Sequence, residues 1–172
     1  MRRIFILGLA ALLISGAALA DTKPILKNVP DSQKVGSGRL SFLIWDVYDA
    51  ALYAPNKIYQ SNQPFALKLS YLIDLKGKDI ATRSVEEMQK QGFVDELQLR
   101  KWQEAMEEIF PDVKEGNTIT GIRDEQGHAL FYLDDKFIGS VNEKDFTNKF
   151  FAIWLDKKTS EPGLRIKLLG MN

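Results

Sequence analysis

The amino-acid sequence predicts an α+β fold in which a layer of helices packs on one face of a large antiparallel β-sheet. Strand-like segments rich in β-branched and aromatic residues come first, two helical segments follow, and further strands and helices end the chain. This grouping differs from the regular strand–helix alternation of a parallel sheet. Residues 124–127 and 134–135 are hairpin turn signals, which indicate antiparallel pairing.

The first 20 residues have the pattern of a secretory signal peptide. Arg2 and Arg3 precede an apolar run over residues 4–19, and Ala18-Leu19-Ala20 forms an A-x-A cleavage site. The run is shorter than the ~20 residues of a spanning helix, which favours removal over a retained anchor. We therefore expect cleavage after Ala20, a periplasmic protein without a stable membrane anchor, and one domain over residues 21–172.

Charge and residue usage exclude several function classes. Without the leader the chain keeps 21 Lys and Arg (23 minus 2) against 23 Asp and Glu, a formal net charge of −2. A nucleic-acid-binding protein would show a surplus of basic residues, and this chain has none, so we expect no nucleic-acid partner. The chain has no cysteine, which excludes disulfides, thiol chemistry and a lipoprotein anchor. Its stability must therefore come from buried apolar surface, to which 18 aromatic residues contribute (10 Phe, 5 Tyr and 3 Trp).

The first half of the mature chain predicts strands. Residues 25–29 indicate one short strand in a polar arm. Residues 35–53 predict a long bent strand or a strand pair, in which Gly36 and Gly38 allow a bulge or a close backbone approach. Residues 64–71 alternate regularly and predict a half-buried strand. Its apolar face consists of Phe65, Leu67, Leu69 and Tyr71.

Two helices are predicted next. The first begins near Lys78, closes at Gly92, and has a buried face formed by Ile80, Ser84, Val85 and Met88. The second runs from Asp95, which can cap it, to Phe110, where Pro111 stops it. Its apolar stripe consists of Leu99, Trp102, Ala105, Met106 and Ile109.

The remaining chain predicts a strand meander and two helices. Strands are expected over residues 118–123, 128–133 and 136–141. A helix over residues 143–155 should begin at Asn142 as its cap, and a short helix should begin at Pro162. The first of these helices buries Phe146, Phe150, Ile153 and Trp154.

Several polar motifs are interpreted as structural. His128 is the only histidine and has no H-x-x-x-H or cysteine partner, so we interpret it as a solvated loop residue. The segment 36–38 lacks the Lys-Ser/Thr of a phosphate loop, and the acidic turns lack the spacing of an EF-hand. We therefore expect no metal, no cofactor and no catalytic nucleophile.

Polar side chains within the apolar strands form the candidate ligand site. An inward arginine beside tyrosine hydroxyls can hold the carboxylate or phenolate of an apolar ligand in a sheet-bounded cavity. The alternative is an exposed Arg39 with the tyrosines as half-buried core residues. The direction of the Arg39 side chain decides between them. The candidate residues are Arg39, Asp46, Tyr48, Tyr53 and Tyr71.

Three parts of the chain resemble the bacterial chalcone isomerase-like proteins. These are residues 38–53, the Phe-Pro-x-x-x-x-Gly segment over 110–116, and residues 150–156 together with 159–162. The resemblance covers nearly the whole mature chain. It implies the chalcone isomerase fold, in which a ligand cleft lies between a large antiparallel sheet and a layer of helices.

The resemblance also implies where a catalytic network would lie. The plant enzymes close a flavanone ring with an arginine and a Thr, Tyr and Asn network. On this chain the threonine and arginine positions fall on Tyr48 and Gly36, and the tyrosine and asparagine positions fall on Ile80 and Glu87. Ile80 cannot donate to an enolate oxygen, and the Glu87 carboxylate would repel it.

The sequence therefore predicts a non-catalytic periplasmic binding domain for a small apolar acid or lipid-like ligand, as in the fatty-acid-binding relatives of this fold. Two alternatives stay open. One is an intramolecular lyase in which Tyr48 and Arg39 replace the lost network. The other is an interaction protein whose cleft is filled by its own side chains. The sequence specifies neither the ligand nor the oligomeric state.

Overall fold

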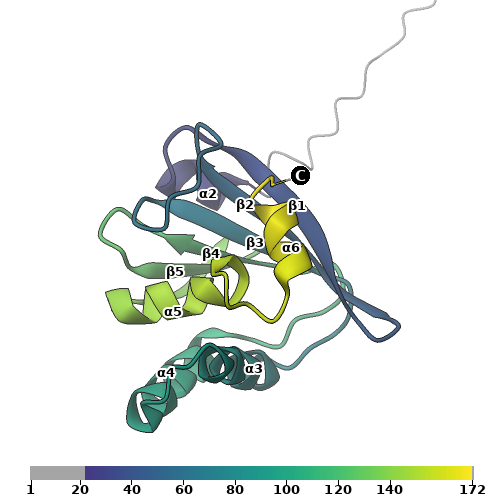
Figure 1. The fold of residues 1–172 in the computed structure, drawn as a ribbon, viewed down its shortest axis with the longest axis vertical. Helices are drawn as coiled ribbons and strands as arrows, with labels where there is room; N and C mark the ends of the chain where they lie inside the picture. Colours follow the sequence, from purple (N-terminus) through teal and green to yellow (C-terminus); the bar gives the residue numbers. More distant parts are fainter. Residues whose placement is uncertain (1–21, 172) are drawn as a thin grey trace, which may run out of the picture.

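The computed structural model describes residues 22–171, which form a six-stranded antiparallel sheet with helices packed against it (Figure 1). The spatial order of the strands follows the chain. They span Ser32–Phe42 (β1), Trp45–Pro55 (β2), Phe65–Tyr71 (β3), Thr118–Arg123 (β4), Ala129–Leu133 (β5) and Lys136–Val141 (β6). The predicted α+β fold is confirmed, whereas the predicted signal peptide lies outside the described residues.

In the part of the chain that the structure describes, one helix precedes the first strand, two lie in the connection between β3 and β4, and two follow β6. They span Lys23–Asn28 (α2), Gly77–Lys90 (α3), Glu96–Ile109 (α4), Lys144–Leu155 (α5) and Pro162–Leu168 (α6). α5 and α6 lie next to the sheet, and α3 packs against both α4 and α5 (Figure 1). Within residues 22–171, no helix is both long and apolar enough to cross a membrane.

The helix ends agree with the sequence in part. The Asp95 carboxylate accepts a hydrogen bond of 3.0 Å from the Gln98 amide, so the predicted cap of α4 is confirmed. The prediction of Asn142 as the cap of α5 is wrong, because Glu143 occupies that position. The Glu143 side chain does not cap the helix and instead accepts a 3.1 Å hydrogen bond from the indole of Trp102.

A second correction concerns residues 25–29, where the predicted strand is the helix α2. Pro24 lies in its first turn, where a missing amide donor costs nothing. Ile25 and Val29 are four residues apart and both buried, a helical spacing. They pack with Ala66, Ile122 and Tyr132 on the face of the sheet opposite the main core.

The main core between sheet and helices is largely aromatic. Phe131 on β5 is fully buried, and its ring centroid lies 5.0 Å from that of Phe110 and 5.1 Å from that of Phe150. Phe146 lies 6.4 Å from Phe131 and stacks on Phe150 at 5.5 Å. Edge-to-face contacts of this kind stabilise a core beyond the area they bury.

Strands β1 and β2 form one long hairpin, so residues 35–53 are a strand pair. The hairpin projects beyond the rest of the sheet (Figure 1, dark blue). A two-residue turn at Leu43 and Ile44 joins the strands. Near the other end, Gly36 lies against the backbone of α6, where an added Cβ would come within 2.6 Å of the Leu168 carbonyl oxygen. The close backbone approach predicted for Gly36 is thus confirmed.

Candidate functional site

A cavity of about 450 Å³ lies between the helix-covered face of the sheet and helices α3 and α5. This volume falls in the range of small-molecule sites. Its inner wall is apolar, and its buried members include Leu69, Phe110, Ile119, Phe150 and Ile153. The cavity is therefore suited to an apolar molecule.

Two tyrosines bring hydroxyl groups into this apolar space. Tyr48 and Tyr71 are paired across β2 and β3, and their ring centroids lie 5.9 Å apart. The Tyr48 hydroxyl accepts a 2.8 Å hydrogen bond from the Trp154 indole. Among residues 22–171, no side chain or backbone group hydrogen-bonds to the Tyr71 hydroxyl. Burial raises the pKa of both tyrosines, so both stay protonated and can donate to a ligand.

The mouth of the cavity carries a polar network around Glu87, whose side chain is 6% exposed. Its carboxylate accepts hydrogen bonds from Ser160 at 2.6 Å and Lys90 at 3.0 Å, and pairs with Arg83 at 2.7 Å. Burial alone would raise the pKa of Glu87. The hydrogen bonds and the charges of Arg83 and Lys90 outweigh burial and hold the pKa below its ordinary value, so the group stays ionised.

The net charge of this mouth is negative. The charged residues that line the cavity are Asp79, Arg83, Glu87 and Glu161, which sum to −2. Lys90 lies outside the lining but donates a hydrogen bond to Glu87, and counting its positive charge leaves a net charge of −1. A ligand carboxylate would meet this negative mouth, whereas a neutral hydroxyl or carbonyl would not be repelled.

We expect Glu87→Gln to lower the free energy of unfolding at pH 7 by about 1 kcal/mol, because it removes charge-assisted hydrogen bonds whose partners are half-exposed. The folded-state pKa is depressed, so this contribution is present above the ordinary pKa of 4.5 and is lost as the pH falls through the folded-state value. The difference in the free energy of unfolding between the parent protein and Glu87→Gln should therefore become smaller at acid pH. Urea denaturation from pH 7 to pH 3 tests this, with exposed Glu86→Gln as control. A difference that stays constant with pH would contradict it.

Arg39 does not point into the cavity, so of the two directions that the sequence left open the structure shows the exposed one. Arg39 binds Asp49 through two hydrogen bonds of 2.6 and 2.8 Å and Asp46 through one of 2.7 Å, and its side chain is 48% exposed. Its neighbour Leu40 and the opposite Tyr48 line the cavity, so alternation along the strands places Arg39 on the other face. Hydrogen bonds from Arg39 lower the pKa of Asp49, which keeps the pair ionised.

The other candidate residues divide between the two faces. Tyr48 and Tyr71 line the cavity, whereas Asp46 does not. Tyr53 packs beside the small cluster under α2, on the opposite face of the sheet. Of the five candidates, the cavity therefore holds only the two tyrosines, while Arg39 and Asp46 pair with each other on the outer face.

The structure also places the positions matched to the plant network. Tyr48, Ile80 and Glu87 all line the cavity, but Gly36 is pressed against α6 and does not. The arginine at the cavity is Arg83 of α3. It follows Ile80 by three residues and precedes Glu87 by four, so helical periodicity could have identified it. Trp154 and Ser160 had no comparable sequence signal.

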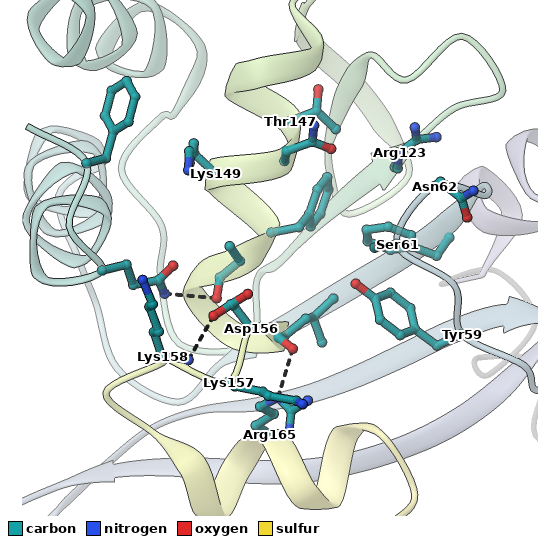
Figure 2. Close-up of a pocket in the computed structure, with 17 residues that line it drawn as sticks. Tyr59, Ser61, Asn62, Arg123, Thr147, Lys149, Asp156, Lys157, Lys158 and Arg165 are labelled. Carbon is teal, nitrogen blue, oxygen red and sulfur yellow. Dashed lines mark hydrogen bonds between the residues drawn. The ribbon is translucent and has the colours of Figure 1, made fainter. Parts of the chain in front are cut away.

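A second hollow of about 820 Å³ lies beside α5 and is lined by Tyr59, Arg123 and Arg165 among others (Figure 2). Its lining carries five cationic side chains and one carboxylate, Asp156. Arg165 donates to the Leu155 carbonyl and Arg123 Nη1 donates to the Asp124 carbonyl, whereas the buried Arg123 Nε has no partner among the described residues. Because most of its charged side chains are cationic, we interpret this groove as a basic surface, and we take the more apolar cavity as the candidate site.

The meander sheet, its helical layer and the cavity between them together define a chalcone isomerase-like fold. Residues 31–170 match the family model described as chalcone isomerase-like, so the chain belongs to this family. A fatty-acid binding protein from Arabidopsis thaliana has the same fold, with a TM-score of 0.64 and 13% sequence identity over 82% of this chain and 88% of that chain. No curated protein matches the sequence.

Proposed function

We propose that the protein binds a small lipid-like molecule in the cavity and does not transform it. The observation that carries this proposal is the Tyr71 hydroxyl, a protonated donor that lines an apolar cavity and has no hydrogen-bond partner among residues 22–171. The hydroxyl oxygen is not fully buried, so a ligand oxygen in the cavity can reach it and accept its hydrogen bond. The name of the plant protein of the same fold, a fatty-acid binding protein, supports an apolar ligand.

A neutral ligand fits this site better than an acid. The sequence suggested an inward Arg39 as the partner of a carboxylate, but that arginine is held on the outer face by Asp46 and Asp49. Arg83, which does reach the mouth, is already paired with Glu87. Of the two ligand classes predicted, the negative mouth favours the neutral lipid-like one.

The two alternative functions have less support. The lyase alternative needs Tyr48 and Arg39 together in the cavity, but Arg39 is bound to Asp46 and Asp49 on the outer face. Ile80 and Glu87 supply no donor for a developing enolate at the matched positions. An interaction protein with a filled cleft would have no cavity of about 450 Å³. Periplasmic localisation remains part of the proposal and rests on the predicted signal peptide.

The proposal is tested by titrating the purified protein with 1-dodecanol and with dodecanoate, which differ only in the head group. Calorimetry at pH 7 should show the alcohol binding at least about tenfold more tightly, a difference of ~1.4 kcal/mol. Tyr71→Phe should weaken alcohol binding by about fivefold, the value of one hydrogen bond. Leu69→Trp, which fills the cavity, should abolish it.

Tyr53→Phe is the matched control, because Tyr53 lies on the opposite face of the sheet. It should leave the affinity unchanged. The melting temperature of each variant shows that it is folded. Tighter binding of dodecanoate would contradict the neutral ligand, and no binding of either molecule would contradict ligand binding in this cavity.

A further inference from the structure

The end of the β1–β2 hairpin exposes four consecutive large apolar side chains, which we call the hairpin tip. Their exposed fractions are 63% for Phe42, 85% for Leu43, 88% for Ile44 and 62% for Trp45. Exposed single apolar residues are ordinary, but a contiguous group of this size indicates an interaction site.

The local chemistry of the turn does not explain these residues. Leu43 has a φ of 56°, in the left-handed region that favours glycine or asparagine. Ile44 is β-branched and follows it in the turn, where small polar residues are usual. In this turn, glycine would adopt the positive φ without strain, and asparagine would be better hydrated than isoleucine. The hairpin tip therefore conflicts with folding preferences, a pattern that marks functional segments.

The hairpin tip is continuous with the mouth of the cavity. Phe42 itself lines the cavity, as do Leu40 and Val47 immediately behind it. On the outer face of the same hairpin, Arg39 is hydrogen-bonded to Asp46 and Asp49. The charges behind the tip are thus largely neutralised by one another, and an apolar path leads from the tip to the cavity.

We propose that the hairpin tip inserts into a lipid surface and places the mouth of the cavity at that surface. A stable protein interface needs ~20–30 residues a side, far more than the four residues of a projecting hairpin end offer. An exposed Trp beside Phe, Leu and Ile has the composition of a segment that lies at a membrane interface. The net charge of Arg39, Asp46 and Asp49 is −1, so insertion needs no anionic lipid.

This inference rests on the proposed function only in naming a lipid surface as the source of the ligand. Docking of the hairpin tip can be measured without any ligand. Binding of 1-dodecanol can be measured without vesicles. Failure of one therefore does not imply failure of the other.

Trp45 provides a direct test, because the other two tryptophans, Trp102 and Trp154, are buried. Adding phosphatidylcholine vesicles to the whole protein should shift its tryptophan emission to shorter wavelength and sediment the protein with the vesicles. Trp45→Phe should remove most of the emission shift and keep sedimentation. Raising the salt concentration should leave sedimentation unchanged.

The variant Leu43→Gly with Ile44→Asn should reduce the vesicle-bound fraction at least about tenfold while its melting temperature stays the same or rises, because Gly-Asn suits the turn. Val94→Asn with Leu97→Gln is the matched control, since these exposed apolar residues lie elsewhere, and should sediment like the parent. Equal sedimentation of both double variants would overturn the proposal. So would binding only to anionic vesicles in low salt, or self-association through the hairpin tip in gel filtration without vesicle binding.

Discussion

Replacing Phe131 with alanine should lower the free energy of unfolding by about 4 kcal/mol, within the range measured for buried Phe→Ala changes. Phe131 is fully buried and lies at the centre of the aromatic core, in edge-to-face contact with Phe110 and Phe150. The rings around it come from α5 and from the end of α4. They cannot collapse into the space without displacing a helix, so a cavity remains.

Urea denaturation of the two proteins at pH 7 measures this loss. Phe137→Ala is the matched control, because Phe137 lies on the neighbouring strand and is 57% exposed. It should cost less than about 1 kcal/mol, as surface changes usually do. Similar losses for both variants would show that the core does not depend on Phe131.

The regular elements of this fold were predictable because their hydrophobic periods are long and consistent. The stripe containing Leu99, Trp102 and Met106 defines α4, and the alternation after Phe65 defines β3. The wrong prediction of a strand at α2 has a physical cause. Its six residues are too few to show a helical period, and its stability comes from Ile25 and Val29 packing on distant strands.

The candidate site was predictable only in part, because register decides which face a strand residue occupies. Tyr48 and Tyr71 were identified and line the cavity, but the sequence left the direction of Arg39 open, and the structure places it on the outer face. β1 has register shifts between Lys34 and Gly36 and between Leu40 and Ser41, and each resets the alternation. The turn at Leu43 carries none of the residues that mark turns, so the hairpin could not be located from local sequence.

The hairpin and the cavity depend on one contact at the far end of β1. Gly36 lies directly under the carbonyl groups of Lys167 and Leu168 in α6. This close approach holds α6 against β1, and α6 follows Ser160 and Glu161 at the mouth of the cavity. Gly36→Ala should therefore lower the free energy of unfolding by about 3 kcal/mol, because the added methyl group meets backbone rather than a movable side chain.

Thermal unfolding should show this as a fall in melting temperature of about 6–12 °C, at ~2–4 °C per kcal/mol for a chain of this size. Gly163→Ala, in the first turn of the same α6, is the matched control, because nothing lies within 4 Å of its added Cβ. Alanine favours the helix there and should leave stability equal or slightly higher. If Gly36→Ala instead matched Gly163→Ala, α6 would not pack on β1 as described, and the mouth of the cavity would lack its C-terminal side.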